Sequence, residues 1–116
     1  MGSISTRPGS GDLDALFAGV VDMVQGNPDD QAFQYELILE ARRRDELRPH
    51  VEQVYATYRE ALRVELEAAG LAADADLVHL VFAAVDGLVF QQVCLGGPGA
   101  TQGALVSLRR LLAALR

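Results

Sequence analysis

The chain has 116 residues, of which half are hydrophobic, and a formal net charge of −6. This length predicts one domain with a core of its own, and the acidic balance argues against nucleic-acid binding, since neutralising phosphates requires clustered Lys and Arg. The single cysteine cannot form an internal disulfide, and the N-terminal sequence lacks the apolar region of a signal peptide. We therefore expect a cytoplasmic protein.

We expect an all-α protein, because no segment alternates β-branched and polar residues between turn signals. Residues 1–11 are rich in Ser and Gly and are expected to be a flexible leader or the remnant of a linker. Residues 12–116 are expected to form one helical domain. Apolar residues at three-and-four spacing predict that this domain is a bundle of five helices.

Three helices are predicted in the first part of the chain. The first spans 12–26, and Pro28 with the two acids after it suits the first turn of a second helix. This second helix is expected to end in the three arginines at 42–44, which complement the negative end of the helix dipole. The third and longest helix is expected over 45–70, and Pro49 is expected to displace its start by a few residues.

The last two helices are predicted to form an unusually apolar hairpin. The fourth is expected to start after Asp74 or Asp76, and the fifth to span 101–115, with a Gly-Gly-Pro-Gly turn between them. Within 77–108 the only charged residue is Asp86. A helix that is hydrophobic on all sides is buried on all sides, so we expect a second copy of the protein to cover one side. The hairpin therefore predicts a homodimer.

The same stretch contains the best candidate for a membrane span, residues 77–95. It is interrupted by polar residues that are costly in hydrocarbon: His79, Asp86, Gln91 and Gln92. We therefore expect a soluble protein with no membrane partner.

Three segments resemble a known family in their residues and order. They are ELILEARRRDELR at 36–48, EAAGL at 67–71 and AAVDGLVFQ at 83–91. With helices in the order medium, medium, long, long, medium, residues 12–116 resemble the C-terminal, ligand-sensing half of a TetR-family transcription regulator. Members normally begin with a helix-turn-helix domain, which residues 1–11 cannot supply. We therefore expect no contact with DNA by this chain itself, only through an N-terminal domain that it lacks.

The resemblance implies dimerisation through the last two helices, which form a four-helix bundle with the same pair from the partner. Such an interface uses the same patch on both subunits. The residues expected in it are Val81, Leu88, Gln92, Leu105, Leu108 and Leu112.

The resemblance also implies a pocket for an unidentified small-molecule effector among the first four helices, and all seven aromatic residues lie on these helices. Pockets are mostly apolar with a few polar groups, for which Tyr55, Tyr58, Asp86 and Gln91 are candidates. The alternative is that the aromatic residues simply form a core. The residues expected to bind the effector are Phe17, Phe33, Leu37, Tyr55, Tyr58, Phe82, Asp86 and Phe90.

Asp86 is the most informative of these residues, because an aspartate in an apolar helix must be paired, protonated or beside water. One interpretation pairs it with a tyrosine hydroxyl or with an arginine such as Arg59. The other lets it face a polar or cationic ligand, and both stay open. Gly87 beside it lowers helix stability and so indicates the close approach of another helix.

Catalysis is not expected. His79, Asp86 and Cys94 share a helix face, but the first two are about 10 Å apart along the axis, too far for a catalytic triad. Cys94 is expected to be a small buried apolar residue. No residues have metal-ligand spacing and no phosphate-binding loop follows a strand, so we expect no metal and no cofactor. The rival hypothesis from another class is a free-standing helical interaction protein that dimerises with a regulator.

Overall fold

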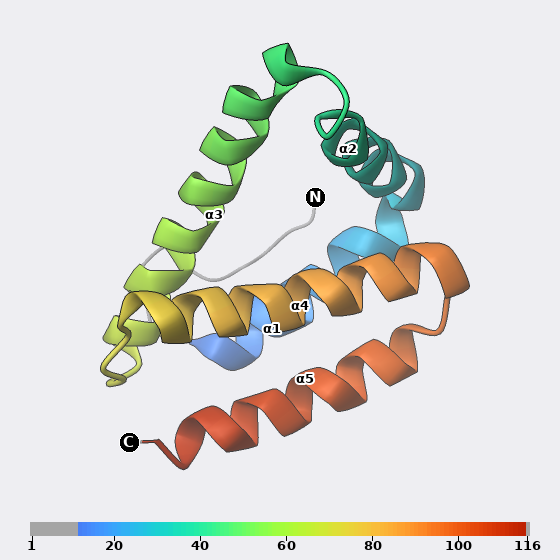
Figure 1. Cartoon of the computed structure of the whole chain (residues 1–116). Coiled ribbons are helices and arrows are strands. Elements are labelled where there is room, and N and C mark those ends of the chain that lie inside the picture. Colours follow the sequence, from blue (N-terminus) through green and yellow to red (C-terminus); the bar gives the residue numbers. More distant parts are fainter. Residues whose placement is uncertain (1–11, 116) are drawn as a thin grey trace.

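The computed structural model describes residues 12–115 and consists, in this range, of helices and their connections (Figure 1). The elements are α1 (Leu13–Gly26), α2 (Pro28–Glu40), the 3₁₀ turn η1 (Asp45–Leu47), α3 (Arg48–Ala68), α4 (Ala75–Leu95) and α5 (Pro98–Ala113). Residues 12–115 contain five α-helices and no strand, so the predicted all-α fold is confirmed. The predicted leader lies outside the described residues.

Short-range signals decide where several helices begin. The Asp74 carboxylate accepts a hydrogen bond from the Leu77 amide at 2.8 Å, so this residue, rather than Asp76, is the N-cap of α4. Pro49 lies in the first turn of α3, and the chain before it forms η1, as the expected displacement implies. α5 begins at Pro98, three residues earlier than predicted, because proline suits a first helical turn.

The lower part of the molecule, which we call the base, consists of α1, α4, α5 and the last two turns of α3. In Figure 1, α4 crosses the molecule with α1 behind it and α5 alongside. Leu66 is fully buried and Leu13 and Val81 nearly so, which accounts for much of the stability, at roughly 1.5–3 kcal/mol for each fully buried large apolar side chain. The main buried side chains of this core are Leu13, Phe17, Val21, Leu62, Leu66, Val78, Val81, Leu105 and Leu112.

The upper part, which we call the arch, consists of α2, η1 and the first part of α3. These elements rise from α4 as two legs that meet near η1 (Figure 1). α2 buries none of its residues, and α3 buries only residues of its C-terminal part, from Leu62 onward. Large apolar side chains of α2 are instead exposed, Phe33 at 60% and Leu39 at 57%. The arch is therefore much less tightly packed than the base.

α4 is the central helix of the fold. Within residues 12–115 it is the one helix whose length and composition would allow it to cross a membrane. The core helix of a helical domain meets the same two criteria. α4 contacts α1, α2, α3 and α5, as the core helix of a helical domain does. Cys94, near its end, is exposed, so the prediction of a buried cysteine is wrong.

Candidate ligand-binding site

Asp86 connects α4 to both legs of the arch. The Tyr35 hydroxyl, on α2, donates to the Asp86 Oδ1 atom at 2.7 Å and to its main-chain oxygen at 3.1 Å. The Tyr55 hydroxyl, on α3, donates to Oδ2 at 3.3 Å. Among residues 12–115, no Arg or His forms an ion pair with this carboxylate. We call these three residues the Asp86 cluster; its contacts within the chain are made by neutral donors.

The surroundings of the cluster keep both tyrosines protonated. Burial, followed by the negative charge of Asp86, raises the pKa of Tyr55 to about 12. Burial and the hydrogen bond to Asp86 raise the pKa of Tyr35 further. Both hydroxyls therefore remain hydrogen-bond donors at neutral pH.

Aromatic rings from the same three helices extend the cluster. Tyr35 meets Phe90 edge to face, with ring centroids 5.1 Å apart, and Tyr55 meets Phe82 in the same way at 5.4 Å. Tyr58 lies 6.4 Å from Phe82 with an angle of 29° between the rings. Aromatic pairs of this kind contribute about 0.5–1.5 kcal/mol beyond their buried area. Aromatic contacts and Asp86 thus connect the arch to α4.

A small hollow of about 250 Å³ lies between the legs of the arch. Its walls come from α2 and α3 and are mostly apolar, with polar groups from Gln34 and His50. Mostly apolar walls with a few polar groups are typical of small-molecule pockets, although such pockets are usually somewhat larger, at ~300 Å³ or more. The lining residues are Gln34, Leu37, Ile38, His50, Val51, Val54 and Tyr58.

The structure brings most of the sequence-predicted ligand residues together. Tyr55 contacts both Asp86 and Phe82, Tyr58 lies beside Phe82, and Phe90 joins the cluster through its ring contact with Tyr35. Leu37 and Tyr58 line the hollow. Phe33 and Gln91 are exposed on α2 and α4. Phe17 does not belong to this group, because it is buried in the base, where α1 packs on α5.

Tyr35 was not among the predicted site residues, although it makes the shortest hydrogen bond to Asp86. The sequence offered one signal, since Tyr35 is one of the aromatic residues on the first four helices. For Asp86 itself, the interpretation that paired it with a tyrosine hydroxyl agrees with the geometry, and two hydroxyls are involved. Arg59 does not pair with it.

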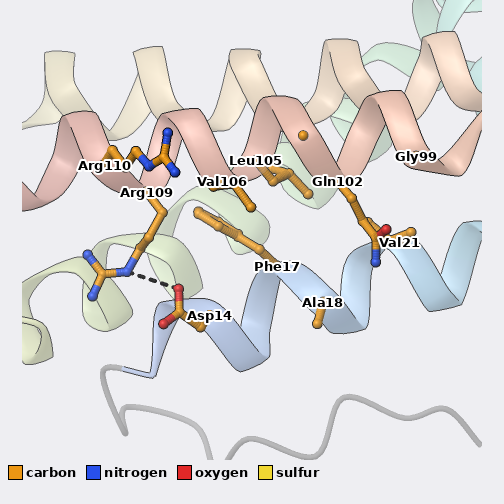
Figure 2. Close-up of a pocket in the computed structure, with 11 residues that line it drawn as sticks. Asp14, Phe17, Ala18, Val21, Gly99, Gln102, Leu105, Val106, Arg109 and Arg110 are labelled. Carbon is orange, nitrogen blue, oxygen red and sulfur yellow. Dashed lines mark ion pairs between the residues drawn. The ribbon is translucent and has the colours of Figure 1, made fainter.

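A second, more open groove of about 600 Å³ lies in the base between α1 and α5. Figure 2 shows Phe17 and Val106 reaching toward each other across it, with Arg109 at one end. The Arg109 Nε atom lies 3.3 Å from an Asp14 carboxylate oxygen. Within the chain, therefore, one of the arginines that line this groove already has an acidic partner.

The residues expected at the dimer interface lie mostly inside the subunit. Val81, Gln92, Leu105 and Leu112 are buried in the described chain, because α1 and α3 cover that side of the hairpin. Leu88 and Leu108 are only partly buried. The interface itself stays a prediction. The exposed apolar residues of the hairpin occupy other helical positions. They are Leu80, Phe90, Leu95, Val106, Leu111 and Leu115.

A family model of tetracyclin repressor-like C-terminal domains matches residues 9–115, nearly the whole chain. The chain therefore belongs to this TetR-like family of C-terminal domains. Domains of this kind are the ligand-sensing and dimerisation parts of soluble transcription regulators, and the match includes no DNA-binding domain. No curated protein and no solved structure matched the chain.

Proposed function

We propose that this chain senses a small-molecule effector, which binds in the hollow between the legs of the arch and beside the Asp86 cluster, and transmits binding to a dimer interface on the hairpin of α4 and α5. The observation that carries the proposal is the Asp86 cluster, in which one carboxylate holds both legs of the arch to α4. Exposed aromatic side chains on the same three helices support it: Phe33 at 60%, Tyr58 at 49% and Phe90 at 43%. A ligand that covers them gains from removing apolar surface from water.

The arrangement offers a route from ligand to dimer. A ligand shifts a conformational equilibrium only through different affinities for the two states. Because Tyr35 and Tyr55 bond to α4, a ligand that spreads or closes the legs of the arch also changes the position of α4. In a two-fold dimer, a shift of α4 would change the spacing of DNA-binding domains attached to the two subunits. Binding to DNA requires such a domain, which lies outside the matched residues.

A thermal-shift screen against a chemically broad library tests the ligand site. A compound present at a hundredfold excess over its Kd stabilises the folded chain by about 2.7 kcal/mol, which is readily detected. We expect such shifts to be strongly reduced in Tyr58→Ala and Asp86→Ala. Val64→Ala is the matched control, because Val64 is also exposed on α3 but does not line the hollow. Shifts that are equal in all of these variants would place the ligand elsewhere and contradict the proposal.

The dimer part of the proposal rests on an exposed surface of the hairpin that contains small residues. Cβ atoms added at Gly87 and Gly103 would meet no atom of another helix within 4 Å, so both positions leave room for a neighbour. Small residues at regular helical spacing allow another helix to approach closely, and a second copy would supply one. We call this surface the hairpin face; it consists of Leu80, Ala83, Gly87, Gln91, Cys94, Ala100, Gly103, Ser107 and Leu111.

Ser107→Arg tests this surface. The serine is exposed in the subunit and does not line the groove with α1, so the arginine is compatible with the fold but would bury a charge at the proposed interface. We expect a dimer for the unchanged chain in analytical ultracentrifugation and a shift toward monomer, by at least about tenfold in Kd, for this variant. Gln102→Arg is the matched control, since it adds the same charge to the neighbouring groove with α1. A folded monomer at micromolar concentration for the unchanged chain would contradict the proposal.

A further inference from the structure

The Asp86 cluster contains a carboxylate that forms no ion pair within the described chain. Asp86 is partly buried and is the only charged residue within 77–108. Its hydrogen-bond partners are two neutral phenol groups, and no ion pair with it forms among residues 12–115. A carboxylate that is partly removed from water without a positive partner is unfavourable. Its charge is therefore available to a bound cation.

The hydrogen-bond capacity of the cluster points to the same class of ligand. Each tyrosine has a single O–H group, and Tyr35 and Tyr55 both direct theirs to Asp86. What remains for a ligand is acceptor lone pairs on the carboxylate and on the two phenol oxygens. An anion, or a ligand with only acceptors, would find no free donor in the cluster and would be repelled by the carboxylate.

The surrounding rings favour a positive charge as well. Phe82 and Phe90 contact the two tyrosines of the cluster, and Tyr58 lies beside Phe82. The faces of aromatic rings attract cations, with contributions of about 0.5–2 kcal/mol depending on exposure. Arg59, on α3, is partly exposed; its charge partly offsets the rise in the pKa of Tyr55, but it forms no ion pair with Asp86. Aromatic rings and a carboxylate without an ion pair thus adjoin one another where α2, α3 and α4 meet.

We infer that the effector is a hydrophobic cation, held with its positive charge near Asp86 and its apolar part against the aromatic side chains of the arch. This inference rests on the proposed function and specifies the class of ligand for the same site. It does not depend on the dimer interface.

Two hydrophobic ions of nearly equal size and opposite charge, tetraphenylphosphonium and tetraphenylborate, test it. Their affinities for the full chain are measured by calorimetry in sodium buffer. We expect the phosphonium ion to bind at least about tenfold more tightly, and Asp86→Asn to remove most of this preference. Asp22→Asn is the matched control, because it removes the same charge from an exposed position on α1. It corrects for the general attraction of an acidic protein for cations.

Tyr55→Phe tests whether the preference for the cation depends on the carboxylate or on an intact set of hydrogen bonds in the cluster. It removes one hydrogen bond but leaves the carboxylate, so the preference for the cation is expected to persist even if Asp86→Asn fails to fold. Equal binding of the two ions, binding of neither, or a preference that Asp86→Asn leaves intact would overturn the inference. If both ions bind equally and Tyr58→Ala weakens both, the ligand site itself is supported and only the cationic class is wrong.

Discussion

The base and the arch use apolar residues in opposite ways. In the base, α1, α4, α5 and the end of α3 enclose side chains such as Leu66 and Val81 almost completely. In the arch, α2 buries no residue, and its Phe33 and Leu39 are more than half exposed. Stability of a domain is not uniform, and segments with few buried contacts open at the lowest free-energy cost. The comparison teaches that the base holds the fold together, while the arch keeps apolar surface available.

The largest expected effect separates the two regions directly. Leu66→Ala in the base should lower the free energy of unfolding by about 2–5 kcal/mol, because it leaves a cavity at a fully buried site. Leu39→Ala in the arch makes the same chemical change at an exposed site and should cost less than about 0.5 kcal/mol. Urea denaturation measures both. Similar losses in the two variants would mean that the arch is as tightly packed as the base.

The next effect tests the connection between the regions. A double-mutant cycle with Tyr35→Phe and Asp86→Ala should give a coupling free energy of about 1–3 kcal/mol, since this hydrogen bond involves a charged group. Tyr58→Phe is the control, because the Tyr58 hydroxyl makes no hydrogen bond within residues 12–115. Its coupling to Asp86→Ala should be close to zero. Equal coupling for both tyrosines would rule out a specific role for Tyr35.

The smallest effect concerns alkaline pH. The pKa of Tyr55 is raised from 10.0 to about 12 in the folded chain, so the unfolded chain loses its proton first as the pH rises. The contribution of Tyr55 to the free energy of unfolding is therefore complete below pH 10 and is lost between about pH 10 and pH 12. Urea denaturation at several pH values should show this decline, and Tyr55→Phe should make it shallower. An unchanged slope in the variant would contradict the assignment.

The helices were predictable from sequence because their signals are local. Apolar periodicity, proline in the first turn and aspartate caps act within a few residues, and they predicted five helices and offered Asp74 as one of two possible caps. The start of α5 was predicted late, because Thr101 looks like a cap, whereas Pro98 already begins the helix. Such errors arise where two local signals lie close together. They move a helix end by a few residues and leave the fold unchanged.

The arrangement of the site was only partly predictable, since it depends on how helices cross. Asp86 was recognisable as a charge in an apolar helix, and a tyrosine hydroxyl was a reasonable partner. Which tyrosines reach it depends on the angles at which α2 and α3 meet α4, so Tyr35 was missed. The residues predicted for the dimer interface lie mostly inside the subunit for a related reason: every side of α4 is apolar, and the sequence does not say which side α1 covers.

The exposed thiol near the end of α4 has a practical consequence. Cys94 is the only cysteine in the chain, and it belongs to the hairpin face. An exposed thiol reacts with a labelling reagent, whereas a covered thiol is protected. Under the proposed dimerisation through the hairpin face, Cys94 of the unmodified protein reports on self-association, and its labelling rate should fall as protein concentration rises.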